Sequence, residues 1–275
     1  MRAVGQRSGL ASVSATGGIA GEIGVGLPLP AGFATADTPT DAPPPAVLFG
    51  AFDRHNLGDI LLAHMQSAGL EHPVFAGLAE RDMTRWSGQK VLPLDSISGP
   101  MSLIHVGGEL LDCDAPQAAF MLGEPAPNWP RRAPYVVPRE QLPAGSVVEF
   151  RAVGGVALAG RDPAYLDEVL AALRQARAVS VRDHVTQRFL AAAGVDAALE
   201  PDPVTRIAGL FGERIRGRIH DSAPYLAVQF AAECGDDRSL DRLARGLARI
   251  GLPVVLFRAG AAPWHDALEP YQRLA

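Results

Sequence analysis

Short apolar runs alternate with amphipathic segments along this chain from residue 46 onward. The first run, residues 45–52, is bounded by turn residues, which is typical of a buried strand. Residues 59–68 then carry apolar side chains at helical spacing, and Gly69 stands where a helix commonly ends. Repeats of strand and helix build parallel sheets with helices on both faces. The pattern therefore predicts an α/β fold.

The same alternation predicts the elements that follow. Further strands are expected at 74–78, 90–94, 101–106, 147–153, 178–181, 225–230 and 252–257, and helices at 163–173, 184–193, 239–250 and 265–274. Residues 114–145 contain seven prolines. No long helix tolerates that many, so this stretch is expected to be an extended excursion from the domain.

Three regions follow from this order of elements. Residues 1–45 are rich in Gly, Ala, Ser, Thr and Pro and build no compact apolar segment, so we expect a disordered leader rather than an export signal. Residues 46–205 are expected to form a first parallel-sheet domain. Residues 206–275 start a second one, which is expected to be incomplete because two strands and two helices cannot cover both faces of a parallel sheet.

Composition excludes several classes of partner. The net charge is -5 without a basic run, so nucleic acid is not an expected partner. No apolar stretch approaches the roughly 20 residues that a membrane-spanning helix needs. Cys113 and Cys234 lie far apart in no metal-ligand pattern and are interpreted as reduced thiols rather than a disulfide. These features favour a cytoplasmic protein.

The loop after the first strand is the first candidate site, because ligands of open parallel sheets bind beyond the carboxyl ends of the strands. Gly58 lets the backbone approach a ligand, and the free N–H groups of the helix that follows favour an anion. In the alternative interpretation, Asn56 shapes a turn and Asp59 caps the helix.

Two later loops are also candidates. Gly107 and Gly108 end a strand and precede Glu109, a possible proton-transfer group, although a plain tight turn explains the glycines equally well. Arg182 stands at the mouth of another strand, where its guanidinium suits a carboxylate or phosphate. Its neighbour Asp183 can serve the ligand or simply cap the next helix.

Together, these loops resemble three motifs of the polysaccharide pyruvyl transferases. The matching segments are 56–59, 106–112, and 180–183 with the later 201–203, in the family's order and rough spacing. The resemblance implies a GT-B-like pair of Rossmann-type domains that face each other across a cleft. It also implies that pyruvate moves from phosphoenolpyruvate to two hydroxyls of a sugar as a ketal, with release of phosphate. The acceptor would belong to a surface polysaccharide or its precursor, and neither a cofactor nor a metal is expected.

The resemblance also implies roles for individual residues. Arg182 would clamp the donor's anionic groups, Glu109 is a candidate catalytic residue, and the substrate-binding set would be Asn56, Gly58, Asp59, Gly107, Gly108, Ser180, Arg182 and Asp183. The family carries a later Arg-x-His motif in its second domain, and this chain is expected to end before the position of that motif. His265 is the nearest candidate for its catalytic histidine, and in the alternative interpretation it merely begins a helix.

Two other functions stay open. A GT-B glycosyltransferase that uses a nucleotide sugar shares the expected architecture, and fold alone does not fix function. A truncated, non-catalytic relic or binding module is the third hypothesis.

Overall fold

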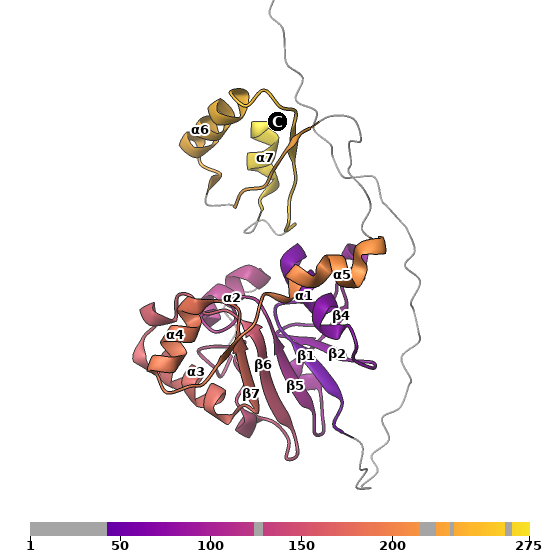
Figure 1. The fold of residues 1–275 in the computed structure, drawn as a ribbon, viewed down its shortest axis with the longest axis vertical. Helices are drawn as coiled ribbons and strands as arrows, with labels where there is room; N and C mark the ends of the chain where they lie inside the picture. Colours follow the sequence, from indigo (N-terminus) through magenta and orange to yellow (C-terminus); the bar gives the residue numbers. More distant parts are fainter. Residues whose placement is uncertain (1–42, 124–128, 215–223, 232–233, 262–265) are drawn as a thin grey trace, which may run out of the picture.

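The computed structural model describes residues 43–123, 129–214, 224–231, 234–261 and 266–275. Its centre is an eight-stranded sheet in which all neighbouring strands are parallel except β3 and β4 (Figure 1). In spatial order the strands are β3 (Arg81–Asp82), β4 (Lys90–Pro93), β2 (Val74–Gly77), β1 (Ala46–Phe49), β5 (Ser102–Val106), β6 (Val147–Val153), β7 (Ala178–Val181) and β8 (Ala198–Leu199). The described residues thus confirm an α/β fold with a mostly parallel sheet.

Helices cover both faces of this sheet because successive strand residues point to opposite sides. In β1, Leu48 packs with helix α1 (Leu57–Ser67) on one face. Val47 and Phe49 join the core on the other face, which includes side chains of α3 (Pro163–Gln175) and α4 (His184–Ala192).

The strand order reverses between β1 and β5. From β1 the chain moves outward through β2 to β4, and then returns to the other side of β1 to form β5, β6, β7 and β8. In open parallel sheets, the loops that leave the strands at such a reversal diverge and leave a crevice where ligands bind. The loops after β1 and β5 therefore frame the expected site.

The prediction that residues 114–145 form an excursion from the domain was wrong. The segment contains the short helix α2 (Ala115–Leu122), and Tyr135 and its neighbours are buried in the main core. Side chains accept from N–H groups of this segment: Val137 N–H donates to Nε2 of the buried His105 over 3.1 Å. Burial lowers the pKa of His105 to about 3, so its imidazole is a neutral structural group.

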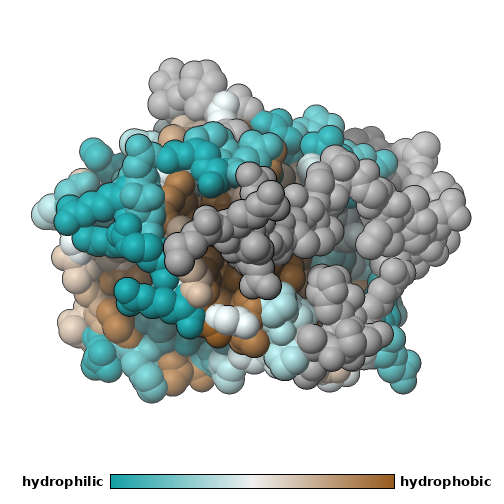
Figure 2. All heavy atoms as spheres, turned by 90° about the horizontal axis from the view of Figure 1, so that it is seen from above, coloured by the Kyte–Doolittle hydropathy of each residue, from teal (hydrophilic) through white to brown (hydrophobic). Residues whose placement is uncertain are grey.

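The C-terminal part forms a small separate core. Strands β9 (Leu226–Val228) and β10 (Val254–Leu256) pair in parallel, and α6 (Asp237–Ala248) and α7 (Leu268–Leu274) pack with them around Phe230. The expected two strands and two helices are therefore present. Seen from above (Figure 2), hydrophobic residues reach the surface between hydrophilic ones. The exposed apolar side chains of this part include Ile250, Leu252, Phe257 and Leu268.

Besides α2, a second short helix was not expected from the sequence. After β8 the chain returns along α1, where Val204 packs against the α1 core and α5 (Ile207–Phe211) follows (Figure 1). The domain boundary at residue 206 stays a prediction. The proposed leader at 1–45 lies outside the described residues except for its last three positions, and so does His265.

Candidate functional site

The amino end of α1 is occupied by protein groups. The side chain of Asn56 caps the helix by accepting from Gly58 N–H at 2.9 Å, and Leu57 N–H donates to the carbonyl of Ala259 at 2.7 Å. Asp59 is not the cap; it pairs with Arg54 at 3.1 Å. The expectation that this helix offers free N–H groups to an anion was therefore wrong at its first two donors.

The C-terminal part supplies the loop that contacts this helix. Ala259 and Gly260 N–H both donate to the buried carboxylate of Asp266, at 2.6 and 3.0 Å, which shapes the loop. Ala261 N–H then donates to Nδ1 of His55 at 2.6 Å. The C-terminal part thus contacts the part that contains the eight-stranded sheet at the loop after β1.

The glycine loop after β5 has a conformation that suits glycine. Gly107 and Gly108 have positive φ values of 46° and 72°. A Cβ on Gly107 would also lie 2.7 Å from Leu62 of α1, so the loop packs tightly over that helix. The turn interpretation therefore describes these two residues, and a binding role for them stays a prediction.

Arg182 lies beside this loop with its charge already compensated. Its guanidinium pairs with Glu109 and, at 2.8 Å, with Asp202. Glu109 also accepts from Val156 N–H at 3.3 Å. The structure therefore brings two of the predicted site residues together, but an anion would have to displace a carboxylate to reach Arg182.

Two predicted residues of the third motif serve the local structure. Oγ of Ser180 accepts from Ala152 N–H at 2.8 Å and donates to Glu200 at 2.9 Å, inside the sheet. Asp183 caps α4 by accepting from Thr186 N–H at 2.7 Å. The capping interpretation of Asp183 is confirmed, and the hydroxyl of Ser180 is engaged by protein groups.

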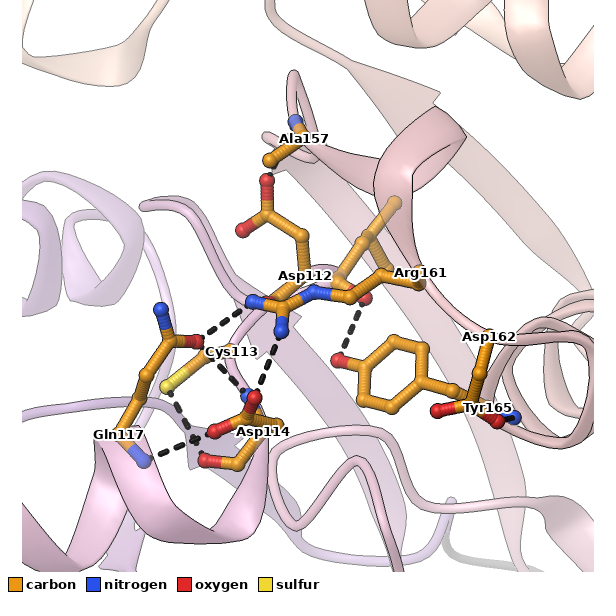
Figure 3. A network of polar contacts seen from close by, with 9 residues as sticks. Asp112, Cys113, Asp114, Gln117, Ala157, Arg161, Asp162 and Tyr165 are labelled. Atoms are coloured by element: carbon orange, nitrogen blue, oxygen red, sulfur yellow. Dashed lines mark hydrogen bonds and ion pairs between the residues drawn. The ribbon is translucent and has the colours of Figure 1, made fainter.

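A polar network fixes the loop after β5 to the loop after β6 (Figure 3). Arg161 pairs with Asp114 at 2.6 Å and donates to Gln117 at 2.6 Å and to the carbonyl of Asp112. Asp114 is at the same time the N-cap of α2. Tyr165 OH donates to the Leu111 carbonyl at 2.9 Å. This network joins the residues that follow the glycine loop to the loop after β6 and to α3.

A cavity of about 390 Å³ lies beside the loop after β1. Its lining includes Arg54, Arg81 and Arg85, and Asp53 is the acidic residue among the described lining residues. Trp86, whose ring centroid lies 4.2 Å from that of His55, closes one side. Asp59 pairs with Arg54, so the three guanidinium groups stand against two carboxyls, Asp53 and Asp59. The remaining excess of positive charge suits an anion with several oxygens. Sequence reasoning missed Asp53, Arg81, Arg85 and Trp86.

A larger hollow, of about 460 Å³, lies at the turn between α4 and β8, with Arg188 among its lining residues. This turn leads into the amino end of β8, whereas ligands of parallel sheets bind at the carboxyl ends. We therefore take the smaller cavity as the candidate site.

Other kinds of site find no support in the described residues. No group of three or more His, Cys, Asp or Glu among them is arranged to hold a metal ion. Within the same residues, no helix has the length and hydrophobicity to span a bilayer. Cys113 and Cys234 are both free thiols, and burial raises the pKa of Cys113 to about 11. The cytoplasmic location stays a prediction.

Comparison with protein-family models, with curated proteins and with solved structures finds no match for this chain.

Proposed function

We propose that this chain transfers pyruvate from phosphoenolpyruvate to a pair of sugar hydroxyls as a ketal. The observation that carries the proposal is the arginine-lined cavity at the reversal of strand order, next to the loop that resembles the first pyruvyl transferase motif. Phosphoenolpyruvate carries a carboxylate and a phosphate on three carbons, and the cavity is large enough for such a molecule.

The reaction needs three kinds of group. Cations must hold the donor's two anionic groups, an acid must deliver a proton to its methylene carbon, and a base must accept the proton of the attacking hydroxyl. Arg81 and Arg85 are the proposed cations for the donor, and Arg54, which Asp59 already binds, lies beside them. Arg182 is less suitable than the sequence suggested, because Glu109 and Asp202 already bind its guanidinium.

The C-terminal part is proposed to form the other side of a GT-B-like cleft. Ala261, from the loop that contacts His55, lines the same cavity. A sugar of a surface polysaccharide or of its precursor would approach the donor from this side. The exposed Glu109, which lies on the neighbouring loop, remains a candidate for proton transfer to or from that sugar.

Phosphate release tests the proposal. The protein is incubated with phosphoenolpyruvate and a galactoside or a mannosaminide, and the sugar is analysed by mass spectrometry for a pyruvyl ketal. We expect phosphate and ketal in equal amounts in the wild type, and strongly reduced amounts in the Arg81→Gln/Arg85→Gln variant. Arg188→Gln, an exposed change at the other hollow, is the matched control and should keep the activity.

Two results would contradict the proposal. Thermal stabilisation by UDP or GDP sugars, without any by phosphoenolpyruvate, would favour a nucleotide-sugar glycosyltransferase instead. A protein that responds to neither kind of ligand would favour the non-catalytic hypothesis.

A further inference from the structure

Asp53 follows β1 and is anchored through one of its two carboxyl oxygens. Oδ2 accepts from Leu78 N–H at 2.7 Å and from Ala79 N–H at 3.0 Å, at the carboxyl end of β2. Gly77 makes this approach possible, because a Cβ there would lie 2.6 Å from Oδ2. The position of the carboxyl group is therefore fixed by backbone contacts.

The other oxygen has no such contact. Asp53 is 2% exposed and lines the cavity, and its Oδ1 is buried without a hydrogen-bond partner among the described residues. Since buried polar atoms are normally hydrogen-bonded, this oxygen is a candidate contact for a proton or a bound molecule.

The surroundings of Asp53 combine positive charge with a low-polarity interior. Desolvation raises the pKa of Asp53 to about 6, although the two backbone hydrogen bonds and Arg54 act in the opposite direction. The hydroxyl of Tyr135 is also buried without a hydrogen-bond partner among the described residues, and it interacts electrostatically with Asp53 and Arg54. Arg54 and Tyr135 interact electrostatically with Asp53, and His55, Arg81 and Arg85 line the same cavity. Asp59 and Cys113 interact in turn with Arg54 and Tyr135.

We propose that the cavity binds an oxyanion together with one proton, which Asp53 carries on Oδ1 and donates to an oxygen of the ligand. The arginines at the lining compensate the negative charge of the ligand, and the neutral carboxyl removes the repulsion that an ionised carboxylate would cause. The ligand class is a small phosphorylated or carboxylated molecule. An ionised Asp53 would leave two acceptors facing each other, so it must take up a proton before the anion binds.

This inference rests on the cavity of the proposed function and deepens it, because a proton beside the donor is what the pyruvyl transfer requires. It concerns binding alone, however, and is tested with an anion that cannot react. Sulfate is the suitable probe, since it remains a dianion throughout the range in which Asp53 titrates.

The test compares sulfate affinity at pH 5 and pH 8 by calorimetry. If only the neutral carboxyl binds, a pKa of about 6 makes the wild type about a hundredfold weaker at pH 8 than at pH 5. Asp53→Asn keeps an oxygen for the two N–H groups and is neutral at every pH, so its affinity should change by less than about fivefold. His55→Gln removes the other titratable ring of the lining, and whatever its effect on the affinity itself, the ratio between the affinities at pH 5 and pH 8 should persist if Asp53 is the titrating group.

A measurement on the wild type alone guards against a variant that does not fold. Binding enthalpies in buffers with different ionisation enthalpies give the number of protons taken up, and we expect about 0.9 per sulfate at pH 7. Binding without proton uptake, or no saturable binding of sulfate, would overturn the inference. Pyruvyl transfer with proton-independent sulfate binding would leave the proposed function intact, whereas proton-coupled binding without transfer would remove the function and keep the inference.

Discussion

Replacing Asp53 by asparagine removes a charge that the fold buries while it keeps the hydrogen bonds that position the side chain. The amide oxygen of asparagine can accept from Leu78 and Ala79 N–H as Oδ2 does in the wild type. Any change in stability that depends on pH therefore reports the ionisation of Asp53 itself.

The expected size follows from the pKa. Burial raises it from 3.8 to about 6, so between these values the native state binds more protons than the unfolded state. The wild type accordingly loses stability relative to Asp53→Asn as the pH rises from 4 to 8, by about 2.5 kcal/mol. The difference in unfolding free energy between the variant and the wild type should thus shift in favour of the variant by about 2.5 kcal/mol between pH 4 and pH 8.

Urea unfolding at several pH values measures this difference. Asp196→Asn, at an exposed aspartate near α4, is the matched control and should run parallel to the wild type at every pH. A constant difference between wild type and Asp53→Asn across the pH range would refute the reasoning, because it would show that Asp53 is ionised in the native state at an ordinary pKa.

Three further predictions concern other parts of the chain. Because burial holds the pKa of His105 at about 3, the wild type should lose about 3 kcal/mol between pH 7 and pH 4 relative to His105→Gln, which urea unfolding would measure. In Gly154→Ala the new Cβ would overlap Oε1 of Glu109, so the variant should remain folded but separate Glu109 from Arg182, which a crystal structure would show. Arg161→Ala removes the contacts that join the loop after β6 to α2, and hydrogen exchange should become faster in α2 while the sheet keeps its protection.

Much of the fold was predictable because hydrophobic periodicity determines it locally. The strand at 147–153 has the expected bounds, and α3 begins at the expected proline after its aspartate cap. The exception was the proline-rich stretch. There, the number of prolines correctly argued against a long helix, but prolines do not prevent burial when side chains such as His105 and Glu168 accept the remaining N–H groups.

The candidate site was less predictable because it depends on which loops meet in space. The sequence identified the loops after β1, β5 and β7, and these do follow the carboxyl ends of their strands. Arg81 and Arg85 follow β2, the neighbour of β1, so the same rule could have pointed to them. Asp53 lies in the loop after β1 that the sequence did identify, but its burial and its unpartnered oxygen, which single it out, exist only in the folded chain.

The amino end of α1, whose first N–H groups are bound by protein groups, shows the same limit of prediction from local sequence. A glycine near the beginning of a helix after the first strand suggests an anion site, but the Ala259 carbonyl, some two hundred residues later, accepts from Leu57 N–H. The local pattern was correct as a description of the helix. Its donors were used by a segment that no local pattern could connect to it.

The most direct test of the account is the binding of phosphoenolpyruvate to the cavity beside β1, measured by calorimetry at pH 6. The wild type should show one saturable site. The Arg81→Gln/Arg85→Gln variant should bind at least about tenfold more weakly, because each charge-assisted hydrogen bond is worth about 1.5–3 kcal/mol, and Arg188→Gln should bind like the wild type. Equal affinity in all three proteins, or a loss confined to Arg188→Gln, would contradict the assignment of this cavity as the donor site.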